Sequence, residues 1–333
     1  SASYWMACAS LISPLLMWSF MARYSPCFLA FYVAGSMAVG LVIGTTGIDL
    51  PYWGQCLISQ AILLIPAFIY VFINKINIYK CIPYRKIKPL DAFLSLVFGY
   101  TLIPVVLFIN VLTQFISTNY MNDAVSDLTS YPFIIQIILL AVIPPVVEEF
   151  IFRGLIYHSY RKNGICGAAL LSGLLFGVTH LNINQLCYAF VIGVMFAFLV
   201  EVTGSMWSSM IAHFAVNTYS ITVMKILSLA GVDVNAMAGQ TQQLSSGSMF
   251  IATIIQVIVL GAIAMGFLAL SILILKKLAE RNGKAGFIRR DFELRHVRRN
   301  GEKFVTIPLI ITLVLAFGYM IFTEIITRLT MMV

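Results

Sequence analysis

Residues 132–157 read PFIIQIILLAVIPPVVEEFIFRGLIY, an apolar run that contains only three charged side chains. A helix of that length would extend about 39 Å, which exceeds the roughly 30 Å of a bilayer's hydrocarbon core. The run therefore predicts a membrane-spanning helix. Charged groups inside such a helix are costly and usually mark a functional site, so Glu148, Glu149 and Arg153 are the first candidates for chemistry.

The composition of the whole chain is typical of a membrane protein. Of 333 residues, 60% are apolar and 10% are charged, whereas soluble domains carry about 25% charged residues. So few charges cannot cover a globule of this size in water. We therefore expect an all-α polytopic membrane helix bundle and exclude soluble enzymes, disordered chains and disulfide scaffolds. The six Cys residues form no CxxC pair, and we interpret them as small apolar fillers.

Ten apolar runs along the chain are long enough to be candidate transmembrane helices. They are residues 3–22, 27–47, 53–73, 92–117, 132–157, 165–183, 185–202, 205–230, 249–275 and 305–327. We divide the chain into about four N-terminal helices over 1–130, a catalytic core over 131–230 and C-terminal helices over 231–333. The last region includes the basic loop 276–304.

The positions of Lys and Arg predict the orientation of the bundle. The net charge is +8, and 18 of the 21 Lys and Arg residues lie in the loops after spans one, three, five and nine. The positive-inside rule makes these loops cytoplasmic, so we expect an integral protein of the plasma (inner) membrane. The basic loop 276–304 could dock membrane lipid, but we favour a topology-setting role for it. We expect no nucleic-acid partner.

The charged residues of span five divide into two groups. Glu149 and Arg153 are four residues apart and share a helix face, which predicts an ion pair. Glu148 points about 100° away from Glu149, so it faces elsewhere and suits the role of general base. Pro144 and Pro145 precede the pair, and we expect them to kink the helix and to free backbone carbonyls.

Two further spans carry polar side chains suited to catalysis. Span six has small residues at four-residue spacing, which predicts close packing on a neighbouring helix: Ala169, Gly173 and Gly177. His180 follows this stripe and should face protein. In span eight His213 and Asn217 share one helix face. Counted from the cytoplasmic loops, these three residues and Glu148 all lie about 12–20 Å deep and could meet in one layer.

Such a layer fits two kinds of water activation. Glu148 could take a proton from water held by His180, while His213 and Asn217 donate to the oxyanion of a tetrahedral intermediate. Alternatively, Glu148, His180 and His213 could bind Zn²⁺ with water as the fourth ligand. The residues themselves do not choose between these mechanisms. Neither a P-loop nor a Rossmann fingerprint is present, so no nucleotide cofactor is expected.

The three segments resemble the motifs of a known family. The first is EExxFRG, from Glu148 to Gly154; the second is Phe176-x-x-x-His180; the third is His213-x-x-x-Asn217. In this order and within apolar helices, they resemble the CPBP family of CAAX proteases and bacteriocin-processing or immunity proteins, which includes the type II CAAX prenyl endopeptidase.

The resemblance implies an intramembrane endopeptidase, of metallo- or glutamate type, whose membrane-associated or lipidated peptide substrate could be prenylated. It implies that Glu148 and His180 activate water, that His213 and Asn217 form the oxyanion site, and that Glu149 with Arg153 supports them. The resemblance also leaves open a non-catalytic immunity or scaffold protein. A proton-coupled transporter is disfavoured, because no internal repeat is evident. The sequence does not determine the oligomeric state.

Overall fold

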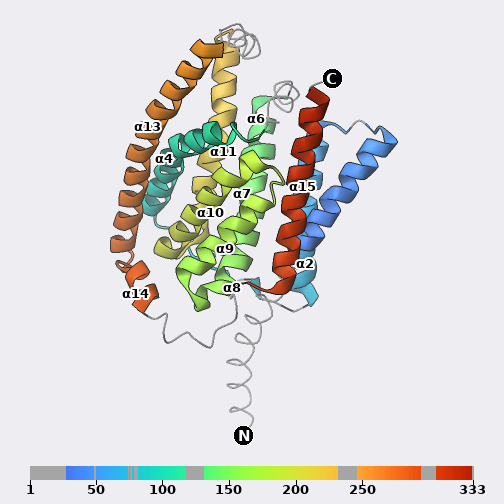
Figure 1. The fold of residues 1–333 in the computed structure, drawn as a ribbon. Coiled ribbons are helices and arrows are strands. Elements are labelled where there is room, and N and C mark those ends of the chain that lie inside the picture. Colours follow the sequence, from blue (N-terminus) through green and yellow to red (C-terminus); the bar gives the residue numbers. More distant parts are fainter. Residues whose placement is uncertain are drawn as a thin grey trace.

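The computed structural model describes residues 28–48, 50–73, 75, 77–78, 82–117, 131–231, 246–293 and 305–331. Within those ranges every regular element is a helix (Figure 1). The helices are Phe28–Thr46, α2 (Tyr52–Ile73), α4 (Pro89–Thr113), α6 (Phe133–Gln136), α7 (Ile143–Glu149), α8 (His158–Tyr160), α9 (Ile165–Val178), α10 (Ile183–Thr203), α11 (Met206–Leu229), α13 (Ser246–Arg281), α14 (Phe287–Glu293) and α15 (Ile307–Met331).

The predicted polytopic bundle is confirmed. In the described ranges, eight helices are long and apolar enough to cross a membrane, and each coincides with a predicted span. The predicted span 3–22 lies outside the described residues. The predicted span five is continuous from Phe133 to Asn163. Two π-helical segments join α6 to α7 and α7 to α8, and a 3₁₀ turn follows α8. They are Ile137–Val142, Phe150–Tyr157 and Arg161–Asn163.

The sixth predicted span is shorter than expected. α9 contains 14 residues and ends at Val178, so it is about 21 Å long and does not reach across the roughly 30 Å hydrocarbon core. A turn follows, in which Leu181 adopts a left-handed φ of 51°. The side chain of Asn182 then caps α10 by accepting a hydrogen bond from the Gln185 amide at 3.0 Å. His180 therefore lies in a turn and not on a helix.

Small residues bring the central helices into backbone contact, as the stripe in α9 predicts. A Cβ atom added to Gly173 would lie 2.9 Å from the Phe190 carbonyl oxygen of α10, and one added to Gly177 would lie 2.8 Å from another α10 carbonyl. On α4, a Cβ atom at Gly99 would lie 2.3 Å from the Ala212 carbonyl oxygen of α11. These contacts fix the spacing of the helices that carry the motifs.

The motif-bearing helices occupy the middle of the bundle. Figure 1 shows α7, α9, α10 and α11 together, with α4 and α13 on one side and α2 and α15 on the other. α4 packs against α10, α11 and α13, so helices from all three predicted regions of the chain contact one another. The boundaries at 130 and 230 stay predictions.

Candidate active site

Span five lacks a backbone hydrogen bond beside its paired prolines. Pro144 has no N–H, so the carbonyl of Leu140 loses its partner four residues on. Asn217 on α11 supplies the missing donor, because its Nδ2 donates to the Leu140 oxygen at 2.8 Å. The expected free carbonyl is thus present, and a predicted site residue binds it. The preceding turns are π-helical, a geometry that occurs often at functional sites.

Glu149 and Arg153 form the predicted ion pair. Arg153 Nη1 donates to Glu149 Oε1 at 2.9 Å, and both side chains are completely buried. The guanidinium carbon of Arg153 lies 4.6 Å from the ring centroid of Phe176 and 5.4 Å from that of Phe196. These rings stabilise the buried cation through cation–π interactions.

His213 lies between the two neighbouring carboxylates. Its Nδ1 hydrogen-bonds with Glu149 Oε1 at 2.9 Å, and its Nε2 lies 3.7 Å from Glu148 Oε2. The rings of Phe176 and Phe196 flank the imidazole, with centroid separations of 5.7 and 5.4 Å. Glu149 therefore orients the imidazole so that Nε2 is directed toward Glu148.

Glu148 has a different environment from Glu149. Its side chain is 13% exposed, whereas that of Glu149 is 0% exposed. Gln60 of α2 donates through Nε2 to Glu148 Oε1 at 3.2 Å. The sequence analysis missed Gln60, although an amide in an otherwise apolar span is the signal that could have identified it. Glu148 is thus held by one neutral donor and has an accessible carboxylate oxygen.

His180 and Asn217 border this centre. His180 Nδ1 hydrogen-bonds with the Phe176 carbonyl at 2.9 Å, which leaves Nε2 for another partner. The imidazole is close enough to Glu148 and His213 to interact with them electrostatically. Asn217 lies one turn beyond His213 on α11. The structure thus places all six predicted site residues around one centre, although no direct hydrogen bond joins Glu148 to His180 or Asn217 in the described residues.

The donor types of Glu148, His180 and His213 suit zinc, but their arrangement does not form a ligand set. Among the described residues, no group of three or more His, Cys, Asp or Glu side chains is placed to hold one metal ion. The Nδ1 atoms of His213 and His180 are engaged by Glu149 and by a backbone carbonyl, which is compatible with metal ligation through Nε2, so the placement of the side chains and not the Nδ1 bonds argues against a ligand set. We therefore derive no step that passes through a metal.

Comparison with known proteins matches the part of the chain that contains this centre. Residues 130–219 match the family described as Type II CAAX prenyl endopeptidase Rce1-like, and this range contains all six predicted site residues. This segment is therefore similar to the CAAX protease family. The resemblance noted in the three motifs is thereby confirmed for this part of the chain.

A relative of the CAAX protease segment is known in Bacillus subtilis (strain 168). The protein named "Putative membrane peptidase YdiL" is 32% identical over 93 residues, which are 28% of this chain. The match covers 38% of that relative's length. No solved structure matches the chain. At family level, these likenesses support a membrane protease.

Proposed function

We propose that the protein is an intramembrane endopeptidase that uses a glutamate-activated water. The observation that carries this proposal is the contrast between two adjacent carboxylates. Glu149 is fully buried and engaged by Arg153 and His213, whereas Glu148 keeps an accessible oxygen 3.7 Å from His213 Nε2. A general base needs such an accessible, oriented carboxylate within reach of water.

The proposed reaction needs only water and the peptide. Glu148 takes one proton from a water that His180 Nε2 helps to hold, and the water oxygen bonds to the scissile carbonyl carbon. The carbonyl electron pair moves to oxygen, which gives a tetrahedral oxyanion. When the oxyanion collapses, the C–N bond breaks and protonated Glu148 returns its proton to the leaving amine.

The hydrogen bonds that His213 and Asn217 already make determine which of their N–H groups can donate to an oxyanion. If His213 donates its Nδ1 proton to Glu149, then Nε2 donates to an oxyanion only when the imidazole carries both protons. The Asn217 amide has two N–H groups, of which Leu140 uses one, so the other is available to substrate.

The substrate class follows from the family and the predicted orientation. We propose a membrane-associated or lipidated peptide, with a prenylated C-terminal tail as the first candidate, cleaved from the cytoplasmic side of a plasma (inner) membrane. The basic loops would then be cytoplasmic.

The test compares wild-type protein with Glu148→Gln in detergent, on fluorogenic peptides with and without a farnesylated CAAX tail. Loss of a general base removes about 10²–10⁴ of the rate, so cleavage should fall by at least about a hundredfold. Glu280→Gln is the matched control, because Glu280 is exposed near the end of α13. Thermal unfolding of all three proteins shows whether each variant is folded.

The same assay separates the competing mechanisms. Activity that a strong chelator removes and added zinc restores would contradict the glutamate-only mechanism. Wild-type cleavage retained in a folded Glu148→Gln variant would contradict the proposal altogether. A cellular phenotype that survives Glu148→Gln would instead support the immunity or scaffold function.

A further inference from the structure

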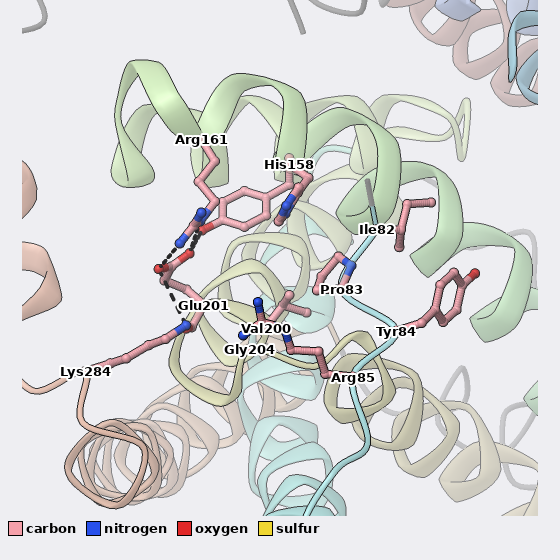
Figure 2. Close-up of a pocket in the computed structure, with 11 residues that line it drawn as sticks. Ile82, Pro83, Tyr84, Arg85, His158, Arg161, Val200, Glu201, Gly204 and Lys284 are labelled. Atoms are coloured by element: carbon pink, nitrogen blue, oxygen red, sulfur yellow. Dashed lines mark hydrogen bonds and ion pairs between the residues drawn. The ribbon is translucent and has the colours of Figure 1, made fainter. Parts of the chain in front are cut away.

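A polar cavity of about 310 Å³ lies at the loop end of the bundle, away from Glu148. It is formed by segments far apart in the sequence: the loop before α4, the end of span five, the end of α10 and the loop after α13 (Figure 2). Tyr157 in its wall is eight residues after Glu149, which corresponds to roughly 12 Å along a helix. We call this cavity the basic pocket, after Arg85, Arg161 and Lys284, which line it.

The basic pocket contains one buried carboxylate, and that carboxylate is fully engaged. Arg161 donates to both oxygens of Glu201, through Nε at 2.5 Å and Nη2 at 2.8 Å. The Tyr157 hydroxyl donates to the same carboxylate at 2.8 Å. Lys284 donates to the Glu201 backbone carbonyl, and its Nζ lies 4.0 Å from the carboxylate. Figure 2 shows Arg161 and Lys284 approaching Glu201 from different sides.

The pocket therefore has an excess of positive charge. Three permanent or nearly permanent cations face one carboxylate, so two positive charges are uncompensated by the acidic residues that line it. The Arg85 side chain has no ion-pair or hydrogen-bond partner among the described residues. Burial lowers the pKa of Lys284; Glu201 opposes this shift, and the nearby positive charges of Arg161 and Arg85 add to it. A bound anion would relieve this repulsion.

The backbone around the pocket is held in place before any ligand binds. Ser205 Oγ donates to the Arg85 carbonyl at 2.6 Å, and the Met206 amide donates to the Pro83 carbonyl at 3.0 Å. Gly204 ends α10 with a φ of 68°, and a Cβ atom there would lie 3.5 Å from Lys284 Nζ. The glycine thus permits the turn and leaves space beside the ammonium.

We propose that the basic pocket binds a phosphate monoester group. Arg and Lys together are the residues that proteins use for phosphate, and a dianion matches the two uncompensated charges. The volume is at the low end for ligand pockets, which suits a headgroup better than a long chain. The group could belong to an anionic phospholipid of the adjacent leaflet or to a soluble phosphate ester. This proposal does not depend on the proposed peptidase activity.

Binding is measured as the ligand-dependent rise in unfolding temperature of the purified full chain. One arm uses glycerol 3-phosphate in detergent at constant ionic strength. The other uses phosphatidylcholine nanodiscs with and without phosphatidic acid. Arg85→Gln should weaken binding about tenfold, the effect of one lost charge-assisted hydrogen bond. Without ligand it should unfold much like wild type, because the Arg85 side chain has no hydrogen-bond or ion-pair partner among the described residues.

The matched control is Lys86→Gln, which removes the same charge from the neighbouring exposed residue that does not line the pocket. Binding that Arg85→Gln weakens and Lys86→Gln does not would support the proposal. Stronger binding in the nanodisc arm would identify the lipid as the source, and equal binding in both arms would identify the soluble ester.

Three results would overturn the proposal. The first is an unfolding temperature that neither phosphate ligand raises. The second is an equal loss of binding in Arg85→Gln and Lys86→Gln, which would indicate general surface attraction. The third is preferential binding of a peptide with a free C-terminal carboxylate over both phosphate ligands, which would assign the pocket to a peptide.

Discussion

Two adjacent glutamates have different surroundings because a helix turns by about 100° per residue. Glu149 faces Arg153 on its own helix and His213 on α11, whereas Glu148 faces Gln60 on α2. Neighbouring residues of one chemical type thus provide one buried structural anion and one accessible carboxylate. Glu148→Gln should therefore lower activity, whereas Glu149→Gln should lower the stability of the fold.

Glu149→Gln should destabilise the fold. It would leave the Arg153 guanidinium, which is completely buried, without its counter-ion, and such a change costs about 3–5 kcal/mol. We expect a large fall in unfolding temperature in detergent. Glu293→Gln is the control, because it breaks an exposed pair with Arg289 that is worth about 0–1 kcal/mol. Similar unfolding temperatures for the two variants would contradict this assignment.

Gln60 is a positioning residue, because it acts on Glu148 and not on substrate. Gln60→Ala should lower kcat by about tenfold or more, since a hydrogen bond to a charged group is worth about 1.5–3 kcal/mol. KM should change little. Gln55→Ala is the control on the same helix, because the side-chain amide of Gln55 donates to the nearby Leu50 carbonyl. A rise in KM with unchanged kcat would instead place Gln60 against substrate.

Local spacing was sufficient to predict some contacts and not others. The Glu149–Arg153 pair follows from a separation of four residues on one helix. Gln60 is 88 residues from Glu148 in sequence, so no local pattern connects the two. The bond from Asn217 to Leu140 was also beyond prediction, although the free carbonyl itself was expected from Pro144.

At the scale of the elements, α11 and span five are joined by the hydrogen bond from Asn217 to the Leu140 carbonyl. That carbonyl is free because Pro144 has no N–H. Asn217→Leu should lower the free energy of unfolding by about 1–3 kcal/mol, since it leaves a partly buried carbonyl without a donor. Pro144→Ala restores a backbone N–H four residues after Leu140. In the Pro144→Ala background, Asn217→Leu should therefore lower the free energy of unfolding by less than in the wild type. A double-mutant cycle on unfolding measures this difference. Additive effects would contradict the capping role.

The ends of most helices were predicted from the sequence, but the end of α9 was not. Most spans agree with the apolar runs within a few residues, because membrane thickness limits them. α9 is the exception, since the polar residues of 179–183 are interspersed with Leu181 and Ile183 while the backbone turns at Leu181. Composition cannot distinguish an apolar turn that is packed within protein from the last turn of a helix.

Across the whole molecule, the basic loops gather at one end of the bundle. The loop before α4, the end of span five and the loop after α13 meet around one cavity, as the predicted topology requires. From the sequence, these loops were interpreted mainly as topological signals, with lipid docking as the alternative for loop 276–304. The pocket itself was not predicted, because residues from 82 to 284 form it and no single segment contains it.

The orientation can be tested with single cysteines in a background that lacks the six native ones. Lys86 and Ser228 are both exposed and lie in segments that are predicted to be on opposite sides. In intact cells a membrane-impermeant maleimide should label Ser228→Cys but not Lys86→Cys, and after lysis it should label both. Labelling of Lys86→Cys in intact cells would reverse the proposed topology.

The pairing of Glu149 with Arg153 also has a consequence for biosynthesis. Each charge at the centre of an inserting helix opposes entry into the bilayer by about 2.5–3.5 kcal/mol. The two partners are one turn apart, so Glu149 acquires its counter-ion as soon as its own helix forms, long before ribosomes synthesise His213. The translocon thus receives a segment with one uncompensated charge, Glu148, and α11 later docks onto a site that is already neutralised.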